Sequence, residues 1–481
     1  MKLRIISTKW LILILIFVAV CVAALGAFLS GKIDRDLIIS YLESEKNIRV
    51  DIEDVSPSLI LGEVNIGGII IGPRDSYADE GLVAEQRSKP ISSKTRIKIS
   101  NVSLKVRLVD LFLDKLSIKS IIIEDLDLAY SINEDGDHSL DSLLDPPKYI
   151  KGVLNPEYER KKKRRELAKI RWKLDSGLKN PDDDSFNASE VPMPTTLDEL
   201  IIKGGRVAIK LDKSGNNVYF SQLKGSITDL DVDPQNLKEH NSALLGLAGN
   251  LKVMGPESNL EYASFDLKAD GTIQPFEASS GFLNPDLITS LTVMEGSKIV
   301  SLPIATRLAS TLEQLESTGL DLSVIDDLLV VDNDTTFSLG LRNYILRAAE
   351  PLPVLINGNQ IILEKNSWLN TANDEHLINA SFTFSDKISQ KAFEKSYEYL
   401  SERVGKGVAS AVSELLFTPV TKNGKIHIPF VSSGDFNRPK VRPSVELKDL
   451  ADAIKEGIKK DPLSILKGLS LIHISEPTRP Y

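Results

Sequence analysis

The feature that most constrains the fold is a two-residue alternation of apolar and polar side chains that recurs along most of the chain. It is clearest in residues 96–108, where every second residue is apolar and the phase then slips at Asn101. Successive side chains of a strand point to opposite faces, so this alternation predicts strands with one buried face. The slip predicts a β-bulge or bend. Polar turns at residues 133–137 and 213–217 separate strands, which favours antiparallel hairpins.

A second constraint is the uncharged apolar run Trp10–Leu29, which is twenty residues long. As a helix it would extend about 30 Å, the thickness of a bilayer core. Lys2, Arg4 and Lys9 precede the run, so the positive-inside rule predicts a cytoplasmic N-terminus and a chain that lies outside the cytoplasm after residue 30. A cleaved signal peptide is the alternative, but the run is long for one and no Ala-x-Ala site follows it. We predict an uncleaved single-pass anchor.

Charge and residue usage exclude several functional classes. The 481 residues include 58 Lys and Arg against 67 Asp and Glu, a net charge of −9, which argues against a dedicated nucleic-acid-binding protein. The single cysteine, Cys21, excludes an intramolecular disulfide. His138, His240, His376 and His427 lack the spacing of a helical zinc site, and no nucleophile elbow or phosphate-binding loop is present. We therefore predict no catalytic residues, no metal site and no cofactor.

Changes in pattern divide the chain into seven predicted segments. Helical periodicity interrupts the β-pattern at residues 304–329 and 387–417. The segments are residues 1–9 (cytoplasmic stub), 10–30 (transmembrane anchor), 31–147 (N-terminal β module), 148–195 (charged helical insertion and linker), 196–445 (β-rich region), 446–468 (amphipathic helix) and 469–481. The last segment contains LSLIHISEPTR, which resembles the translation of a sequencing adapter, so we expect an artefact there and a natural chain that continues past Gly468.

Six consecutive basic residues lie in the charged insertion. Three interpretations remain open: a solvent-exposed helical insertion, adsorption to an anionic membrane surface, or nucleic-acid binding. A basic residue near an anionic membrane contributes about 1 kcal/mol, and the predicted location outside the cytoplasm disfavours nucleic acid. The residues are Arg160, Lys161, Lys162, Lys163, Arg164 and Arg165.

The order of these motifs resembles the AsmA-like family of envelope proteins that are anchored in the inner membrane. The family opens with a membrane helix, a short helix and a strand that ends in a Val-x-x-Ser-Leu turn. It closes with a Gly-x-Ile-x-Ile-Pro strand followed by a Gly-x-Phe-x-x-Pro-x-Val-x-Pro strand. The matching segments here are residues 55–59, the strand Val64–Ile71, residues 102–116 and 118–132, the turn Asp135-Gly136, Leu140-x-x-Leu143-Leu144, and residues 424–443. Leu126 stands near the position where the family often has a proline, so the match is imperfect there.

The resemblance implies a mainly β protein with helical insertions, in which an elongated, twisted antiparallel sheet is folded into a groove. It also implies a Gram-negative protein, single-pass in the inner membrane with most of the chain in the periplasm, that conducts lipids, phospholipid above all, toward the outer membrane. Membrane lipids are then the expected partners, with other envelope or secretion proteins as further candidates and no nucleic acid. The alternative is a non-enzymatic scaffold or assembly factor for outer-membrane proteins or type II secretion.

A lipid groove needs a continuous apolar face on alternating strand positions. The alternative is that the same residues fill a closed sandwich core. The candidate lining residues are Ile97, Ile99, Val102, Leu104, Leu126, Leu128, Tyr130, Val207, Ile209 and Leu211.

Overall fold

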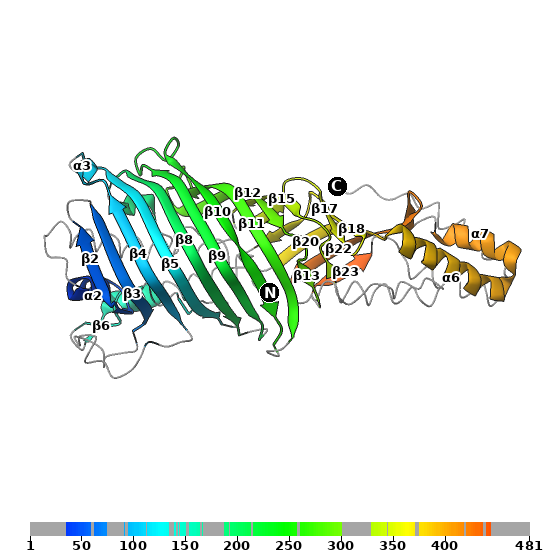
Figure 1. The fold of residues 1–481 in the computed structure, drawn as a ribbon, viewed down its shortest axis with the longest axis horizontal. Coiled ribbons are helices and arrows are strands. Elements are labelled where there is room, and N and C mark those ends of the chain that lie inside the picture. Colours follow the sequence, from blue (N-terminus) through cyan, green and yellow to red (C-terminus); the bar gives the residue numbers. More distant parts are fainter. Residues whose placement is uncertain are drawn as a thin grey trace. The chain divides into compact units, whose positions relative to one another are not determined.

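The computed structural model is mainly β-structure, as the alternation predicts (Figure 1). It divides the chain into two compact units: unit 1 comprises the described residues within 1–293, 337–346 and 370–374, and unit 2 the remainder. The boundary at residue 293 falls inside the β-rich region predicted at 196–445. The structure describes residues 35–58, 62–74, 91, 95–111, 113–133, 139–140, 143, 145–150, 153–163, 166, 187–191, 193–212, 215–256, 260–300, 329–343, 345–370, 375–417, 420–435 and 439–443.

Unit 1 is a large twisted sheet with one helix packed against it. Its strands lie in the order β1 and β2, β3, β4, β5, β8, β9, β10, β11, β12. The elements are α2 (Arg35–Glu45), β1 (Ile48–Asp51), β2 (Asp54–Ser58), β3 (Glu63–Pro73), β4 (Arg96–Val106), α3 (Leu108–Leu111), β5 (Leu116–Ile132), β6 (Tyr149–Ile150), β7 (Val153–Leu154), the 3-10 helix η5 (Ala188–Glu190), β8 (Thr195–Leu211), β9 (Asn217–Val232), β10 (Asn241–Met254), β11 (Glu261–Phe276) and β12 (Leu283–Val293).

The sheet is mixed, which corrects the expectation of a purely antiparallel one. β5 and β8 pair in parallel from Leu116↔Thr195 to Ile132↔Leu211, whereas the other pairs of unit 1 with a described register are antiparallel. Parallel neighbours need a long crossover rather than a tight turn. Residues 133–194 are that crossover, and they contain all but the last residue of the insertion predicted at 148–195.

A line of irregular positions crosses the sheet at one level and bends it. The phase slip predicted at Asn101 belongs to this line. The residues that precede or flank the irregular positions are register partners on five successive strands, and they are Gly67, Asn101, Glu124, Lys203 and Lys224. The irregular residues have positive φ and are Gly68 (61°), Asp125 (53°), Gly204 (77°) and Gln222 (53°). Each strand shifts its phase at the same level, so one apolar face is preserved through the bend. β10 and β11 then pair without a shift from Ala243↔Ile273 to Val253↔Ala263.

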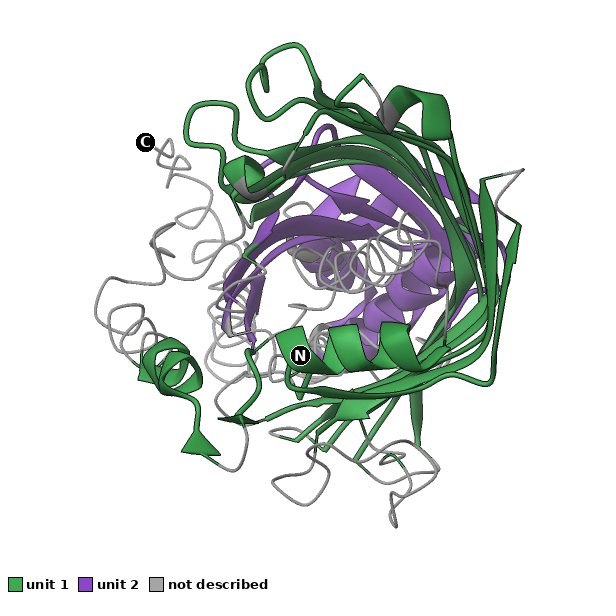
Figure 2. Cartoon of the chain, turned by 90° about the vertical axis from the view of Figure 1, so that its left-hand side faces the viewer, with its two compact units in different colours: residues 1–293, 337–346, 370–374 green, residues 294–336, 347–369, 375–481 purple. Residues whose placement is uncertain are grey.

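The bend makes the face that carries the main hydrophobic cluster concave, and Figure 2 shows the strands of unit 1 curving around that side. The helix α2 packs against this face through Ile38, Ile39 and Leu42, which are 0–6% exposed. Leu140 and Leu143 from the crossover belong to the same cluster. The core of unit 1 therefore lies between β1–β8 and a cover made of α2 and part of the crossover.

Unit 2 contains shorter strands and two helices. The clearest ladder pairs β20 with β22 from Glu375↔Asp435 to Thr383↔His427. The elements are β13 (Lys298–Ile299), β14 (Leu329–Val330), β17 (Leu352–Ile356), β18 (Asn359–Leu363), β20 (Glu375–Thr383), α6 (Asp386–Val404), α7 (Lys406–Phe417), β21 (Thr421–Lys422), β22 (Lys425–Asp435) and β23 (Lys440–Pro443). Three strands have residues in both units: β15 (Thr335–Arg342), β16 (Ile345–Ala348) and β19 (Trp368–Asn370).

The helical stretch predicted at 387–417 is two helices, not one. Gly405 lies between α6 and α7 with φ of 78°, a conformation that glycine adopts without steric cost. Ser385 caps α6 by accepting a hydrogen bond from the backbone N–H of Ile388 at 3.4 Å. Both helices pack on a second cluster that includes Phe382 and Ile428 of the sheet and Phe384, which follows β20.

Several predicted segments lie outside the described residues: the stub and anchor at 1–30, the amphipathic helix at 446–468, the tail at 469–481, and residues 304–328 of the helix predicted at 304–329. Residue 329 begins β14 instead. Among the helices that the structure describes, none has the length and apolarity needed to cross a membrane.

Candidate functional site

Three rows of apolar residues run across the concave face of unit 1, perpendicular to the strands. Directly paired residues of neighbouring strands share a face, so the registers define each row. The first row is Val50, Ile71, Ile97, Leu128, Val207, Phe220, Leu251 and Phe265; the second is Val55, Ile66, Val102, Ile123, Ile202, Gly225, Leu247, Ala269 and Leu291; the third is Val64, Leu104, Ile121, Leu200, Ile227, Leu245, Gly271 and Thr289. The face stays almost wholly apolar from β1 to β12.

The predicted lining residues all lie on this face, at its covered end. They come from β4, β5 and β8, they are at most 5% exposed, and they belong to one cluster with the helix α2. The structure therefore brings all ten together, as a packed core rather than as an open surface: Ile97, Ile99, Val102, Leu104, Leu126, Leu128, Tyr130, Val207, Ile209 and Leu211. We name the part of the face on β1–β8 the covered region.

The same face is much less buried on β9–β12, which we name the open region. Leu247 is 37% exposed, and Phe220, Leu251 and Phe265 are half-buried at positions whose row partners on β5 are at most 6% exposed. On β11 the residues of this face alternate with exposed polar ones, namely Asp266, Lys268, Asp270, Thr272 and Gln274. Among the described residues this face is buried at both ends of these strands: Val218, Val253 and Ala263 are 0–3% exposed at one end, and Val232, Phe276 and Leu283 pack with Ala188 of η5 at the other.

Sequence reasoning missed the open region as a candidate site. The signal was present, because the alternation in residues 261–269 predicts a strand with one apolar face. Nothing in a two-residue period distinguishes an apolar face that is covered from one that is not. The residues that form it include Phe220, Leu245, Leu247, Leu251, Phe265, Leu267, Ile273, Leu287 and Leu291.

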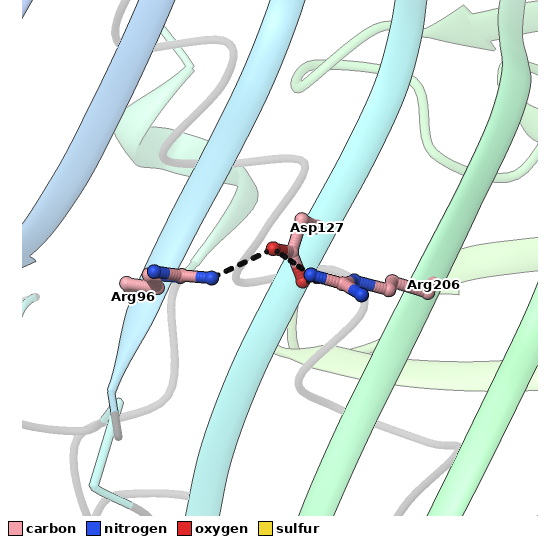
Figure 3. Close-up of polar contacts among 3 residues, drawn as sticks. All are labelled: Arg96, Asp127 and Arg206. Atoms are coloured by element: carbon pink, nitrogen blue, oxygen red, sulfur yellow. Dashed lines mark hydrogen bonds and ion pairs between the residues drawn. The ribbon is translucent and has the colours of Figure 1, made fainter. Parts of the chain in front are cut away.

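The opposite face of the sheet is charged, and its most connected group centres on Asp127 of β5. Arg206 of β8 donates two hydrogen bonds to this carboxylate, from Nε and Nη2, both at 2.8 Å. Arg96 of β4 donates a third at 3.0 Å, so the three side chains tie three strands together (Figure 3). The hydrogen bonds from Arg206 and Arg96 lower the pKa of Asp127, against the opposing effect of burial. These hydrogen bonds link β4, β5 and β8 on the outer face of the sheet, opposite the covered region.

The basic residues of the insertion are exposed where the structure describes them. Arg160, Lys162 and Lys163 are exposed and Lys161 is half-buried, in a helical segment at residues 156–163. Arg164 and Arg165 lie outside the described residues. None of the four described basic side chains is in the apolar cluster of unit 1.

The described histidines contact different neighbours. His240 Nδ1 is 2.6 Å from a carboxylate oxygen of Asp231, and this hydrogen bond raises the pKa of His240. His376 Nε2 lies 2.7 Å from the hydroxyl of Ser432, whereas burial lowers the pKa of His427. Among the residues that the structure describes, no group of three or more His, Cys, Asp or Glu is arranged to hold a metal ion. His138 lies outside the described residues.

Comparison with known proteins adds no assignment. No family model matches the sequence, and neither a curated protein nor a solved structure does so.

Proposed function

We propose that this protein binds lipid acyl chains on the open region of its concave face and conducts lipids, with phospholipid as the expected class, between the membranes of a Gram-negative envelope. The observation that carries the proposal is the burial gradient along one apolar face. The rows that are buried on β1–β8 continue onto β9–β12, where their side chains are partly exposed and Thr289 is the one polar residue among those that the rows contain. A face that is partly exposed and this apolar is typical of a binding surface.

The dimensions of the open region suit an acyl chain. Five half-buried residues of β11, from Phe265 to Ile273, point to the concave face, and the eight residue steps between the first and the last extend about 26 Å. One leaflet of a bilayer core is about 15 Å thick, so a lipid chain fits along the strand. Burying one CH₂ contributes about 0.8 kcal/mol, so sixteen carbons would contribute on the order of 10 kcal/mol.

A chain lying along the strands would need no chemical step to move. Neighbouring sites on an aliphatic face have similar affinity, and the headgroup can stay in water. The charged outer face disfavours the same contact on the other side of the sheet, since burying Lys268 or Asp270 under a lipid would cost desolvation energy.

A pair of photocrosslinking probes tests this proposal. Leu247 is 37% exposed on the concave face, and Ile288 of β12 is 67% exposed on the opposite face, because its partner Thr272 alternates with the concave residues of β11. A photoreactive amino acid at residue 247 in the full chain, expressed in a Gram-negative host, is expected to capture phospholipid. The matched probe at residue 288 is not.

The outcome separates the two functional classes. Lipid adducts at 247 and not at 288, detected by mass spectrometry of the crosslinked protein, support lipid binding. Equal lipid capture at both positions would mean non-specific contact and would overturn the proposal. Capture of envelope or secretion proteins at 247 without lipid would favour the scaffold or assembly factor instead.

A further inference from the structure

The β6–β7 hairpin presents apolar side chains to solvent on both of its faces. Ile150 pairs with Val153 on one face, and Tyr149 pairs with Leu154 on the other. Ile150, Val153 and Leu154 are 50%, 70% and 41% exposed. A two-stranded hairpin is marginally stable by itself, and exposed aliphatic residues add nothing to its stability. Their exposure therefore needs another explanation.

Hydrogen bonds join the hairpin to the helical segment that follows it. Asn155, which is buried, closes it by donating from its backbone N–H to the carbonyl of Lys148 at 2.9 Å and from Nδ2 to the carbonyl of Pro147 at 2.8 Å. Asn155 Oδ1 also accepts from the backbone N–H of Glu157 at 3.0 Å, which caps the helical segment that follows. The apolar hairpin and the helical segment at 156–163 are thus one joined element.

That helical segment carries the basic residues. Arg160, Lys162 and Lys163 are exposed, and eight helical residues extend only about 12 Å, so these charges lie close to the apolar hairpin. An additional cation directly precedes the hairpin, where Lys148 Nζ is 5.5 Å from the centre of the Tyr149 ring. Apolar side chains beside a cluster of cations match the surface of a bilayer that contains anionic lipids.

The element is attached next to the end of α2. Asn47, which follows α2, accepts a hydrogen bond from the backbone N–H of Lys148 at 3.3 Å and donates its own N–H to the carbonyl of Asp145 at 2.7 Å. Figure 1 shows β6 beside α2. Eleven residues of α2 extend about 16 Å, and the few residues between the predicted anchor at 10–30 and Arg35 add at most about 18 Å. The hairpin is therefore within reach of the membrane that holds the anchor.

We propose that the β6–β7 hairpin and the basic helical segment form a second membrane contact, in which Ile150, Val153 and Leu154 enter the interface and the lysines bind anionic headgroups. This contact would hold the covered end of unit 1 against the bilayer. It depends on the predicted anchor for its position, but not on lipid conduction by the open region. A result that contradicts one of the two proposals therefore does not contradict the other.

Fluorescence quenching by lipid-borne quenchers tests the contact. The full chain with Cys21→Ser and Val153→Cys is labelled at residue 153 and reconstituted into vesicles of phosphatidylglycerol and phosphatidylcholine. The matched control carries the label at Ile288→Cys, which has nearly the same exposure, 67% against 70%. We expect strong quenching at 153 and little at 288, together with weaker quenching at 153 in phosphatidylcholine alone or at high salt.

Charge removal gives a quantitative readout. The double variant Lys162→Gln and Lys163→Gln is expected to lower the ratio of membrane-bound to unbound hairpin about 25-fold. Each basic residue contributes roughly a factor of five to that ratio. The control pair Lys224→Gln and Lys268→Gln, on the outer face of the sheet, should leave the ratio unchanged. All substituted residues are exposed, and circular dichroism checks that the variants are folded.

Three outcomes would contradict the proposed membrane contact. Quenching at 153 that does not exceed quenching at 288 would mean that the hairpin does not meet the bilayer. Equal quenching in neutral and anionic vesicles would remove the role of the basic residues. Binding of an RNA oligonucleotide that displaces the hairpin from anionic vesicles would assign the basic residues to nucleic acid.

Discussion

The covered and open regions belong to one sheet face and share one sequence pattern, yet they differ in burial. Leu128 on β5 is 1% exposed and Leu247 on β10 is 37% exposed, although both are leucines at face positions of central strands. The difference comes from what lies over each region. α2, Leu140 and Leu143 cover β1–β8, whereas in the described part of the chain the face on β9–β12 is buried at the two ends of its strands, around Val253 and at the η5 cluster, and half-buried between them. Covering elements, not strand sequence, decide which part of the face is available to a ligand.

The comparison predicts a large difference in stability between equivalent truncations. Leu128→Ala should lower the free energy of unfolding by about 3 kcal/mol, because it leaves a cavity in a packed cluster. Leu247→Ala should cost less than about 1 kcal/mol, since its side chain is already partly in water. Denaturant titration of both variants measures the difference. Equal losses would show that the open region is packed as tightly as the covered region and would argue against a ligand surface there.

The second prediction concerns the bend, which crosses the covered region and ends at β9. Gly204 has φ of 77°, and a Cβ there would lie 3.3 Å from Oδ1 of Asp125. Gly204→Ala should therefore destabilise the protein by about 1–2 kcal/mol. The control is Gly340→Ala on β15, where φ is not positive and nothing lies within 4 Å of the added Cβ. A neutral Gly204→Ala variant would mean that the positive φ is not needed for the curvature.

The smallest predicted effect lies on the outer face. Asp127→Asn should cost about 1 kcal/mol, because the variant loses the charge that binds both Arg206 and Arg96. The comparable change on the outer face of β11, Asp270→Asn, removes an ion pair with Lys268 in which both side chains are 62% exposed, and should change stability by less than about 0.5 kcal/mol. Thermal melts of the two variants at neutral pH measure this contrast.

The pH dependence of the difference in stability between wild type and Asp127→Asn follows from the direction of the Asp127 pKa shift. The pKa of Asp127 is lowered in the folded protein, so its contribution is complete above the pKa of an unfolded aspartate, about 3.9. It is lost as the pH falls through the lower folded value. Wild type and Asp127→Asn should therefore differ at neutral pH and converge in acid. A difference that persists in acid would assign the effect to packing rather than charge.

The alternation predicted the strands of the covered region and which of their residues share a face. Ile97, Leu104, Leu128 and Val207 were all expected on the same side, and the registers confirm it. The phase slip at Asn101 was likewise visible as a local signal. The parallel pairing of β5 with β8 was not, because partners such as Leu128 and Val207 are far apart in sequence and no local pattern encodes the direction of pairing.

The sequence by itself determined that the chain makes strands with one apolar and one charged face, because side chains alternate at the level of single residues. It also predicted helical structure at 387–417, although the break at Gly405 was not foreseen. Only the tertiary structure decided which part of the apolar face is covered. Burial depends on elements distant in sequence, such as α2 over β5, and exposure at Leu247 or Val153 is a property of the folded chain.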